Sequence, residues 1–158
     1  MTLSTWLLVC TAAYTLHAFE EFELDWRDWA RAIIKLPVEW HDFYVVNFSV
    51  IVLGFAAAGI GEAAPWLALA FPGLMLINAT FFHLAPMVWT GGRYSPGAAT
   101  AVVFFYPIGI ATYWSAANAG LLDAWAVIGS LAVGAALMAM PIVLLHIKSR
   151  PYFQQDRS

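Results

Sequence analysis

The first 21 residues read MTLSTWLLVCTAAYTLHAFEE, and they decide the class of fold. Residues 1–16 carry no charge, and a membrane-spanning helix needs about 20 mostly apolar residues. The run ends in His17-Ala18-Phe19-Glu20-Glu21. Because residues three and four apart share one face of a helix, one imidazole and two carboxylates point to a common side. Burying them unpaired is costly, so the sequence predicts a metal, a partner charge or a water-filled cavity beside them.

The composition of the whole chain is that of a membrane protein. Of its 158 residues, 62% are hydrophobic and 11% charged, and the mean hydropathy is +0.74. Soluble domains carry roughly 25% charged residues. The single cysteine, Cys10, excludes an intrachain disulfide and a cysteine-based metal cluster. We expect one transmembrane helical domain over residues 1–158, with the lipid bilayer rather than nucleic acid as its partner.

The pattern of apolar runs predicts an all-α integral membrane protein with five transmembrane helices. The five spans are at about 3–22, 42–62, 65–89, 97–119 and 122–147. After the first span, Trp26, Trp29 and Ile33 recur at helical spacing opposite charged residues. This predicts an amphipathic interfacial helix at about 24–36. Before the fourth span, we expect Ser95 to cap the helix and Pro96 to be its first residue.

The distribution of basic residues predicts the orientation. With five spans, all lysines and arginines lie on one side of the membrane, whereas the other side has only Glu62 and Asp123 besides the N-terminus. Because basic residues favour the cytoplasmic side, we expect the N-terminus outside and the C-terminus in the cytoplasm. The basic residues are Arg27, Arg31, Lys35, Arg93, Lys148, Arg150 and Arg157.

All four histidines fall near the predicted cytoplasmic ends of their helices. His17 and His83 lie within apolar spans, where ionisable side chains mark functional sites by default. His41 and His146 lie at the membrane boundary, where solvation or a helix-end interaction explains them equally well. The sequence leaves open whether these two belong to the site.

Imidazole and carboxylate ligands suit Zn, Fe or Mn. We predict that His17, Glu20 and His83 are metal ligands and that Glu21 is an acid or base for a metal-activated water. Asn78 and Tyr94 are predicted as further catalytic residues, although Asn78 could instead bridge helices and Tyr94 could anchor the interface. The apolar surroundings favour a lipid or isoprenoid-like substrate. The predicted protein is therefore a metal-dependent hydrolase, oxygenase or cyclase.

Other functions fit the same residues. Without a metal, Glu20 or Glu21 could hold a proton and act as the acid of an isoprenoid cyclase or isomerase. The groups could also relay protons in a transporter, although five spans are few for an inverted-repeat carrier and a homo-oligomer would have to compensate. An accessory subunit whose partner shares the buried charges is a further alternative. The metal content of the purified protein separates the metal-dependent enzyme from these three alternatives.

Two features accompany the motif at the end of the first span. Asn78 and His83 lie on a later span, and Tyr94-Ser95-Pro96-Gly97 forms the turn that follows it. With these residues the chain resembles the HXXEE-domain family of small bacterial integral membrane proteins, over roughly residues 10–115. The resemblance implies a multi-pass protein of the bacterial inner (cytoplasmic) membrane and no particular reaction. The residues that it implies act together are His17, Glu20, Glu21, Asn78 and His83.

Overall fold

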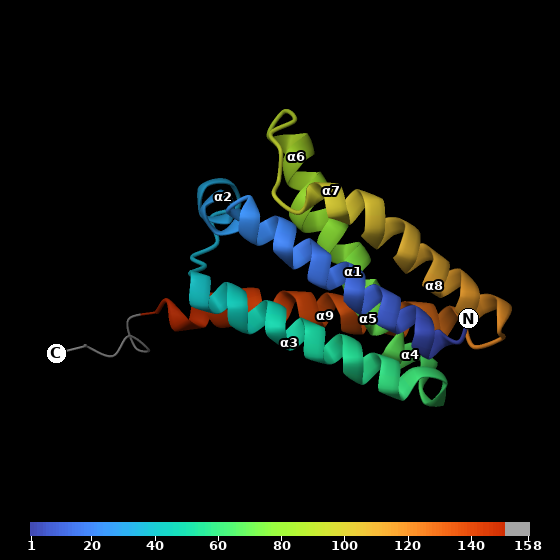
Figure 1. Ribbon diagram of the computed structural model, residues 1–158. Helices are drawn as coiled ribbons and strands as arrows, with labels where there is room; N and C mark the ends of the chain where they lie inside the picture. The colour runs from blue at the N-terminus through green and yellow to red at the C-terminus, as the bar shows by residue number, and fades with distance from the viewer. Residues whose placement is uncertain (151–158) are drawn as a thin grey trace.

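The computed structural model describes residues 1–150, and these form a bundle of helices (Figure 1). No strand occurs within residues 1–150, so the predicted all-α class is confirmed. In chain order the elements are α1 (Leu3–Glu23), α2 (Trp26–Ile33), α3 (Trp40–Ile60), η1 (Gly61–Ala63), α4 (Pro65–Ala68), α5 (Ala70–Asn78), η2 (Ala79–Leu84), α6 (Ala85–Trp89), α7 (Ala98–Thr100), η3 (Ala101–Phe105), α8 (Tyr106–Asn118) and α9 (Ala124–Lys148).

Four continuous helical segments are long and apolar enough to cross a membrane, which indicates a membrane protein. They are Trp40–Ala63, Pro65–Trp89, Ala98–Asn118 and Ala124–Lys148, close to four of the predicted spans. Helix α1 is not among the four, although at 21 residues it is as long as α3. Its last two turns contain His17 and three glutamates, which lower its hydropathy.

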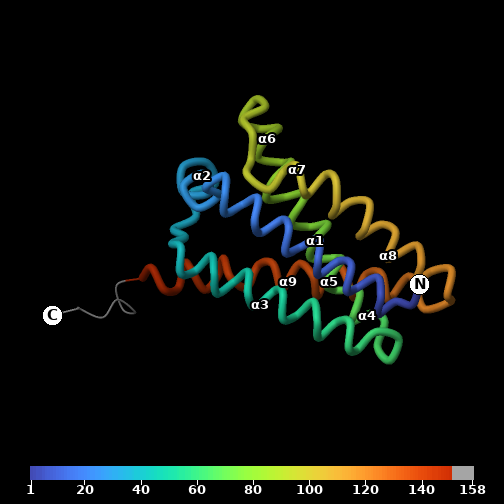
Figure 2. The backbone as a smooth tube through the Cα atoms, in the orientation of Figure 1, coloured from blue at the N-terminus to red at the C-terminus, as the bar shows by residue number. Residues whose placement is uncertain are grey.

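Helix α1 packs against α3, α5 and α8 with one face (Figure 2). Its buried side chains recur every three or four residues and therefore form one stripe along the helix. The stripe begins with apolar residues and ends in two ionisable ones, whereas Glu20 lies beside it and is half-buried. The members of the stripe are Leu3, Leu7, Cys10, Tyr14, His17 and Glu21.

Two local predictions differ from the structure. The amphipathic helix α2 is shorter than predicted because Asp25 and Lys35 on either side of it have left-handed backbone conformations, with φ of 57° and 59°. The helix of the fourth predicted span begins at Ala98 rather than Pro96, after Gly97 with φ of 94°. Ser95 is therefore not the helix cap, and its fully buried side chain is turned into the bundle instead.

The two ends of the bundle differ in charge. Helix α2, the turn after α6 and the end of α9 lie away from the N-terminal end of α1 (Figure 1). These segments contain the basic residues up to Arg150, while Arg157 lies outside the described residues. At the opposite end, Glu62 accepts a hydrogen bond from the Leu3 amide at 3.2 Å, and Asp123 caps α9 through the Ala126 amide at 2.7 Å.

Candidate functional site

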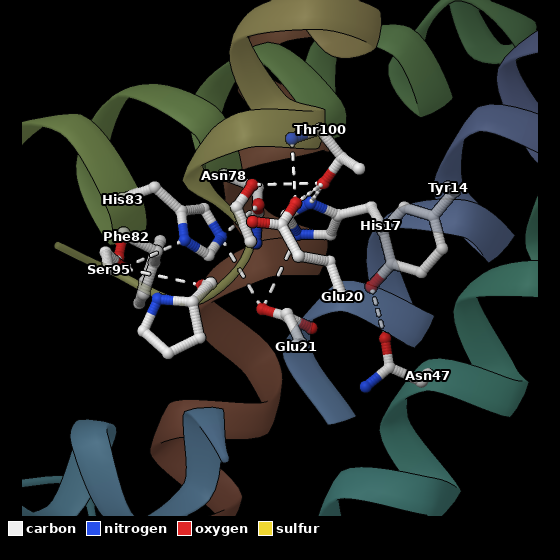
Figure 3. Close-up of polar contacts among 12 residues, drawn as sticks. Tyr14, His17, Glu20, Glu21, Asn47, Asn78, Phe82, His83, Ser95 and Thr100 are labelled. Carbon is white, nitrogen blue, oxygen red and sulfur yellow. Dashed lines mark hydrogen bonds and ion pairs between the residues drawn. The ribbon is translucent and has the colours of Figure 1, made fainter. Parts of the chain in front are cut away.

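Three buried side chains converge at the end of the α1 stripe: His17, Glu21 and His83 (Figure 3). The Nε2 atoms of His17 and His83 each lie 3.5 Å from Oε1 of Glu21. The two imidazole rings stand nearly perpendicular, with centroids 4.8 Å apart. Both rings are fully buried and Glu21 is 5% exposed. One ligand atom from each residue lies within 4.8 Å of the others, so this cluster could hold a metal ion.

A π-helical segment brings Asn78 and His83 onto one face. In an α-helix, residues five apart point about 140° away from each other. Here η2 is π-helical, and Nε2 of His83 lies 3.1 Å from Oδ1 of Asn78. Pro86 follows this segment and lacks an amide hydrogen, so the carbonyl of Phe82 has no donor four residues later. Such π turns occur often at functional sites.

The turn between α6 and α7 closes over the two imidazoles. Ser95 Oγ lies 3.1 Å from Nδ1 of His83. A Cβ atom at Gly97 would lie 2.6 Å from Cε1 of His83 and 2.7 Å from Cε1 of His17, distances too short for carbon atoms. Glycine is therefore required at position 97 both by this contact and by its positive φ of 94°.

Glu20 contacts a different group of residues. Its Oε2 accepts hydrogen bonds from the Thr100 amide at 2.7 Å and the Thr100 hydroxyl at 2.5 Å. Its Oε1 accepts from the Ala99 amide at 3.2 Å and from the hydroxyl of Tyr94. The carboxylate thus lies at the first turn of the helix that begins with α7, where negative charge is favourable. The structure brings two of the predicted ligands, His17 and His83, together with Glu21, and it places Glu20 beside this cluster.

Thr100 connects Glu20 to His17. The Thr100 hydroxyl lies 2.5 Å from Glu20 Oε2 and 3.1 Å from the Gly97 carbonyl oxygen, and both of these only accept, so its single proton points to one of them and not to His17. The Thr100 oxygen then accepts from Nδ1–H of His17 at 2.9 Å. The other ring nitrogen, Nε2, consequently has a free lone pair, and this buried atom has no hydrogen-bond partner among the described residues. Metal-binding histidines are usually oriented in this way by a partner of the second nitrogen.

His83 is hydrogen-bonded at both nitrogens in one neutral form. When Nε2 is protonated it donates to Asn78 Oδ1, and Nδ1 accepts from the Ser95 hydroxyl. The Ser95 oxygen also lies 3.5 Å from the carbonyl oxygens of Phe82 and Pro96, so Ser95 could instead donate to a carbonyl and accept from Nδ1–H of His83. The Nε2 lone pair would then face Asn78 Oδ1, which cannot donate. The form of His83 that a metal requires therefore needs the Asn78 oxygen to turn away from Nε2.

The remaining predicted residues lie outside the cluster. Tyr94 contacts Glu20 rather than the imidazoles, and partial burial together with this hydrogen bond raises the pKa of Tyr94, so it remains a donor at neutral pH. His41 and His146 are exposed. The first is a partner of Lys148 and Asp42, and the second bonds the carbonyl of Ile142.

A small cavity of about 60 Å³ lies next to Glu21 and Asn78. Most of its walls are apolar and come from α2, α3, α5 and α9. The cluster therefore has an apolar space on one side and the polar turn with Ser95 and Thr100 on the other. Of the three residues of the cluster, Glu21 lines this apolar space.

The sequence reasoning missed three residues of the site: Ser95 in its observed role, Gly97 and Thr100. For Thr100 and Gly97, no local pattern indicates a site, because their roles depend on contacts with α1. For Glu20 and Glu21 the spacing was not decisive, because position 20 is three and position 21 four residues after His17, and the burial of α1 distinguishes them.

The comparisons with known proteins agree with the predicted family. The family described as "Protein of unknown function with HXXEE motif" matches residues 6–112, so the chain belongs to the HXXEE family. The chain is also 29% identical over 148 residues to the uncharacterized protein YrkK of Bacillus subtilis (strain 168), covering 85% of this chain and 90% of that protein. No solved structure matches the chain.

Proposed function

We propose that this HXXEE-family protein is a membrane-embedded enzyme that uses a divalent metal ion to act on a lipid or isoprenoid-like substrate. The observation that carries the proposal is Nε2 of His17, a buried nitrogen that has no hydrogen-bond partner within residues 1–150. Leaving such a group unpaired costs about 1–3 kcal/mol. A metal ion held between His17, Glu21 and His83 removes this cost and satisfies the carboxylate at the same time.

The ligand set favours a catalytic rather than a structural metal. Structural zinc sites have four protein ligands, whereas catalytic sites have three and leave one position open. His17, Glu21 and His83 supply three, and both histidine and carboxylate suit Zn, Fe or Mn. When bound, such an ion supplies Lewis acidity or, if redox-active, oxidation. The apolar cavity beside Glu21 and Asn78 supports a lipophilic substrate.

Glu20 is proposed as a positioning residue instead of a ligand. Through Thr100 it keeps the proton of His17 on Nδ1 and directs the Nε2 lone pair towards the metal. Its contacts with Tyr94 and Ala99 also hold the closing turn against α1. Asn78 is then the hydrogen-bond partner of His83 and part of the wall of the substrate space. Tyr94 holds the Glu20 carboxylate by a hydrogen bond.

We further propose five membrane crossings, with α1 as the first. A helix of 21 residues is about 30 Å long, which matches the hydrocarbon core of a bilayer. The ionisable residues His17 and Glu21 of α1 face the bundle rather than lipid. The basic residues at one end favour an external N-terminus, a cytoplasmic C-terminus and a site near the cytoplasmic face of a bacterial inner membrane.

Metal analysis tests the proposal. Protein purified in detergent without chelator is expected to contain one equivalent of Zn, Fe or Mn per chain by mass spectrometry of the elements. His17→Ala and His83→Ala should lose it, because each removes one of three ligands. His146→Ala is the matched control, since this exposed histidine lies outside the cluster, and it should retain the metal. Metal-free wild-type protein, or full metal in both ligand variants, would contradict the proposal.

One observation favours a second function, a metal-free acid/base cyclase or isomerase of isoprenoids. Both nitrogens of His83 can be satisfied by Asn78 and Ser95 without any metal, and its Nε2–H also faces Glu21. Glu21 would then exchange a proton with the substrate. In that case the purified protein contains no metal, and Glu21→Gln abolishes turnover of a candidate isoprenoid while the protein stays folded.

A further inference from the structure

A groove on the lipid-facing surface runs between α3 and α9. Helix α3 packs against α1 and α4, and α9 packs against α5 and α4, while α3 and α9 scarcely touch each other. The groove between them has a volume of about 430 Å³ and is almost entirely apolar. Its walls include Val45 and Val46 of α3 and Pro141, Leu144 and Leu145 of α9. In a membrane, such a groove is open to hydrocarbon chains from the side.

The groove and the small cavity beside the cluster share a wall. Val46, Pro141 and Leu145 line both spaces, and so does Asp42 at the charged end of the groove. On the far side of the cavity lie Glu21 and Asn78. A single layer of side chains therefore separates the lipid-facing groove from a space that reaches the His17, Glu21 and His83 cluster.

The cavity is suited to the chain of an amphiphile and not to its head group. Its polar lining is limited to a few groups, while most of the wall is made of aliphatic and aromatic side chains. A charged head group placed there would lose its hydration without gaining enough partners. Trp26 also lines the cavity, and its buried Nε1–H has no hydrogen-bond partner among the described residues, which leaves one donor for a neutral oxygen.

The charged end of the groove is suited to an anionic head group. Lys148 Nζ donates to Asp42 Oδ1 at 2.7 Å and to His41 Nε2 at 2.6 Å. An ammonium group has three hydrogens, so one remains for another acceptor. The side chain of Lys148 is 54% exposed, at the end of the bundle that carries the basic residues. Anionic amphiphiles concentrate near such basic segments.

We infer that α3 and α9 frame a lateral port for a single-chain amphiphile with an anionic head group, a carboxylate or a phosphate. The head group binds at Lys148, and the hydrocarbon chain bends between Val46 and Leu145 to reach Glu21. The reacting atoms are thus on the chain. This inference rests on the proposed function for the identity of the reacting centre, and it adds the class of substrate and its route.

The shared wall must open for the chain to enter. A cavity of about 60 Å³ is smaller than the 150 Å³ cavity that accommodates benzene. Val46 and Leu145 are only partly buried and lie on helices that hardly contact each other, so a change of side-chain rotamer at these two positions could open the wall. A large side chain at position 46 is therefore expected to block the route.

Photo-crosslinking tests the port with full-length protein in detergent. Two long-chain fatty acids are used, one with a diazirine at the chain end and one with a diazirine next to the carboxylate. The chain-end probe should label residues of the inner cavity such as Glu21 and Met138, and the head-end probe should label Asp42 or Lys148. The inference is wrong if the chain-end probe labels only lipid-facing residues, or if the head-end probe labels Glu21.

Matched variants separate the port from general effects. Val46→Trp should abolish the chain-end adducts in the cavity, whereas Val45→Trp, at a 65% exposed position of the same groove, should leave them. Lys148→Ala should reduce labelling by the fatty-acid probe several-fold but not labelling by the alcohol of equal length. Equal losses in both tryptophan variants, or no effect of Lys148→Ala, would overturn the inference.

Two further arms identify the head group and separate this inference from the metal proposal. An unlabelled fatty acid and an alkyl phosphate of equal length compete with the probe, and the stronger competitor indicates the natural head group. Failure of both to compete contradicts the anionic head group. Val46→Trp should keep the full metal content, since it does not touch the ligands. If the expected labelling occurs in protein without metal, the port stands and the metal proposal fails.

Discussion

Single side chains explain why the motif contains two adjacent glutamates. Glu21 lies on the buried stripe of α1 one turn after His17, and it faces both imidazoles. Glu20 lies at the edge of that stripe and binds the backbone and hydroxyl of Thr100. The two carboxylates therefore have different contacts. Glu21 belongs to the cluster, and Glu20 binds Thr100, which in turn contacts His17.

Thr100→Val tests the connection between Glu20 and His17. Valine keeps the shape of threonine but cannot accept from Nδ1–H, so the orientation and proton position of His17 are no longer fixed. Loss of such a partner typically lowers metal affinity about 10–100-fold. Competition with a chelator of known affinity measures the change. Thr15→Val is the control, because the Thr15 hydroxyl donates to the Thr11 carbonyl one turn away and lies outside the cluster, and equal affinities in the two variants would refute the role of Thr100.

Gly97→Ala tests the close contact above the imidazoles. The added carbon would collide with both rings, and alanine is strained at φ of 94°. Gly92→Ala is a matched control with φ of 93° and open space around the new carbon. In Gly92→Ala the free energy of unfolding should fall only by the cost of the strained backbone, about 1–3 kcal/mol. Gly97→Ala should lose more thermal stability and also the metal, as measured by thermal unfolding and metal content. Similar behaviour of the two variants would show that the contact is unimportant.

At the scale of helices, interruptions of regular α-helix shape the site. The π-helical segments η2 and η3 lie against each other, and each is followed closely by a proline, Pro86 or Pro107. In η2 the wider turn lets Asn78 and His83 meet, which a regular helix would prevent. The path of the segment Pro65–Trp89 therefore depends on the position of Pro86.

Pro86→Ala tests this dependence. Alanine restores an amide that can donate to the Phe82 carbonyl, which favours a regular α-turn and rotates Asn78 away from His83. Metal affinity should fall while the helical content stays the same, as measured by chelator competition and circular dichroism. Pro65→Ala is the control, since a proline in the first turn of a helix replaces no internal hydrogen bond. Unchanged affinity in Pro86→Ala would mean that other contacts maintain the turn.

The sequence allowed the helices to be predicted better than the site. The spans at about 42–62, 65–89 and 122–147 agree with the structure within a few residues, because the length of an apolar run is a local property. The π segments, the start of α7 at Ala98 and the roles of Ser95 and Thr100 were not predicted. They depend on contacts across the bundle, such as the Glu20–Thr100 bond between residues 80 positions apart. The different surroundings of Glu20 and Glu21 also depend on such contacts, because both positions lie within one turn of His17.

The whole molecule has one end rich in basic residues and one end with Glu62 and Asp123. Cysteine labelling in whole cells tests the proposed topology. In a Cys10→Ala background, Glu62→Cys and Asn118→Cys should react with a membrane-impermeant maleimide from outside, and Arg93→Cys and Ser149→Cys only after permeabilisation. Thr2→Cys decides the number of crossings, because five spans place it outside. Labelling of Thr2→Cys only in permeabilised cells would mean that α1 does not cross.

The long-range contacts of α1 have a consequence for the order in which the protein is made. Helix α1 leaves the ribosome before the partners of its polar end, His83, Ser95 and Thr100, and Thr100 follows Glu20 by 80 positions. At about 5–20 residues per second, synthesis of this interval takes about 4–16 s. The polar end of α1 therefore reaches its final surroundings only after Thr100 has been synthesised, and this contact completes the site.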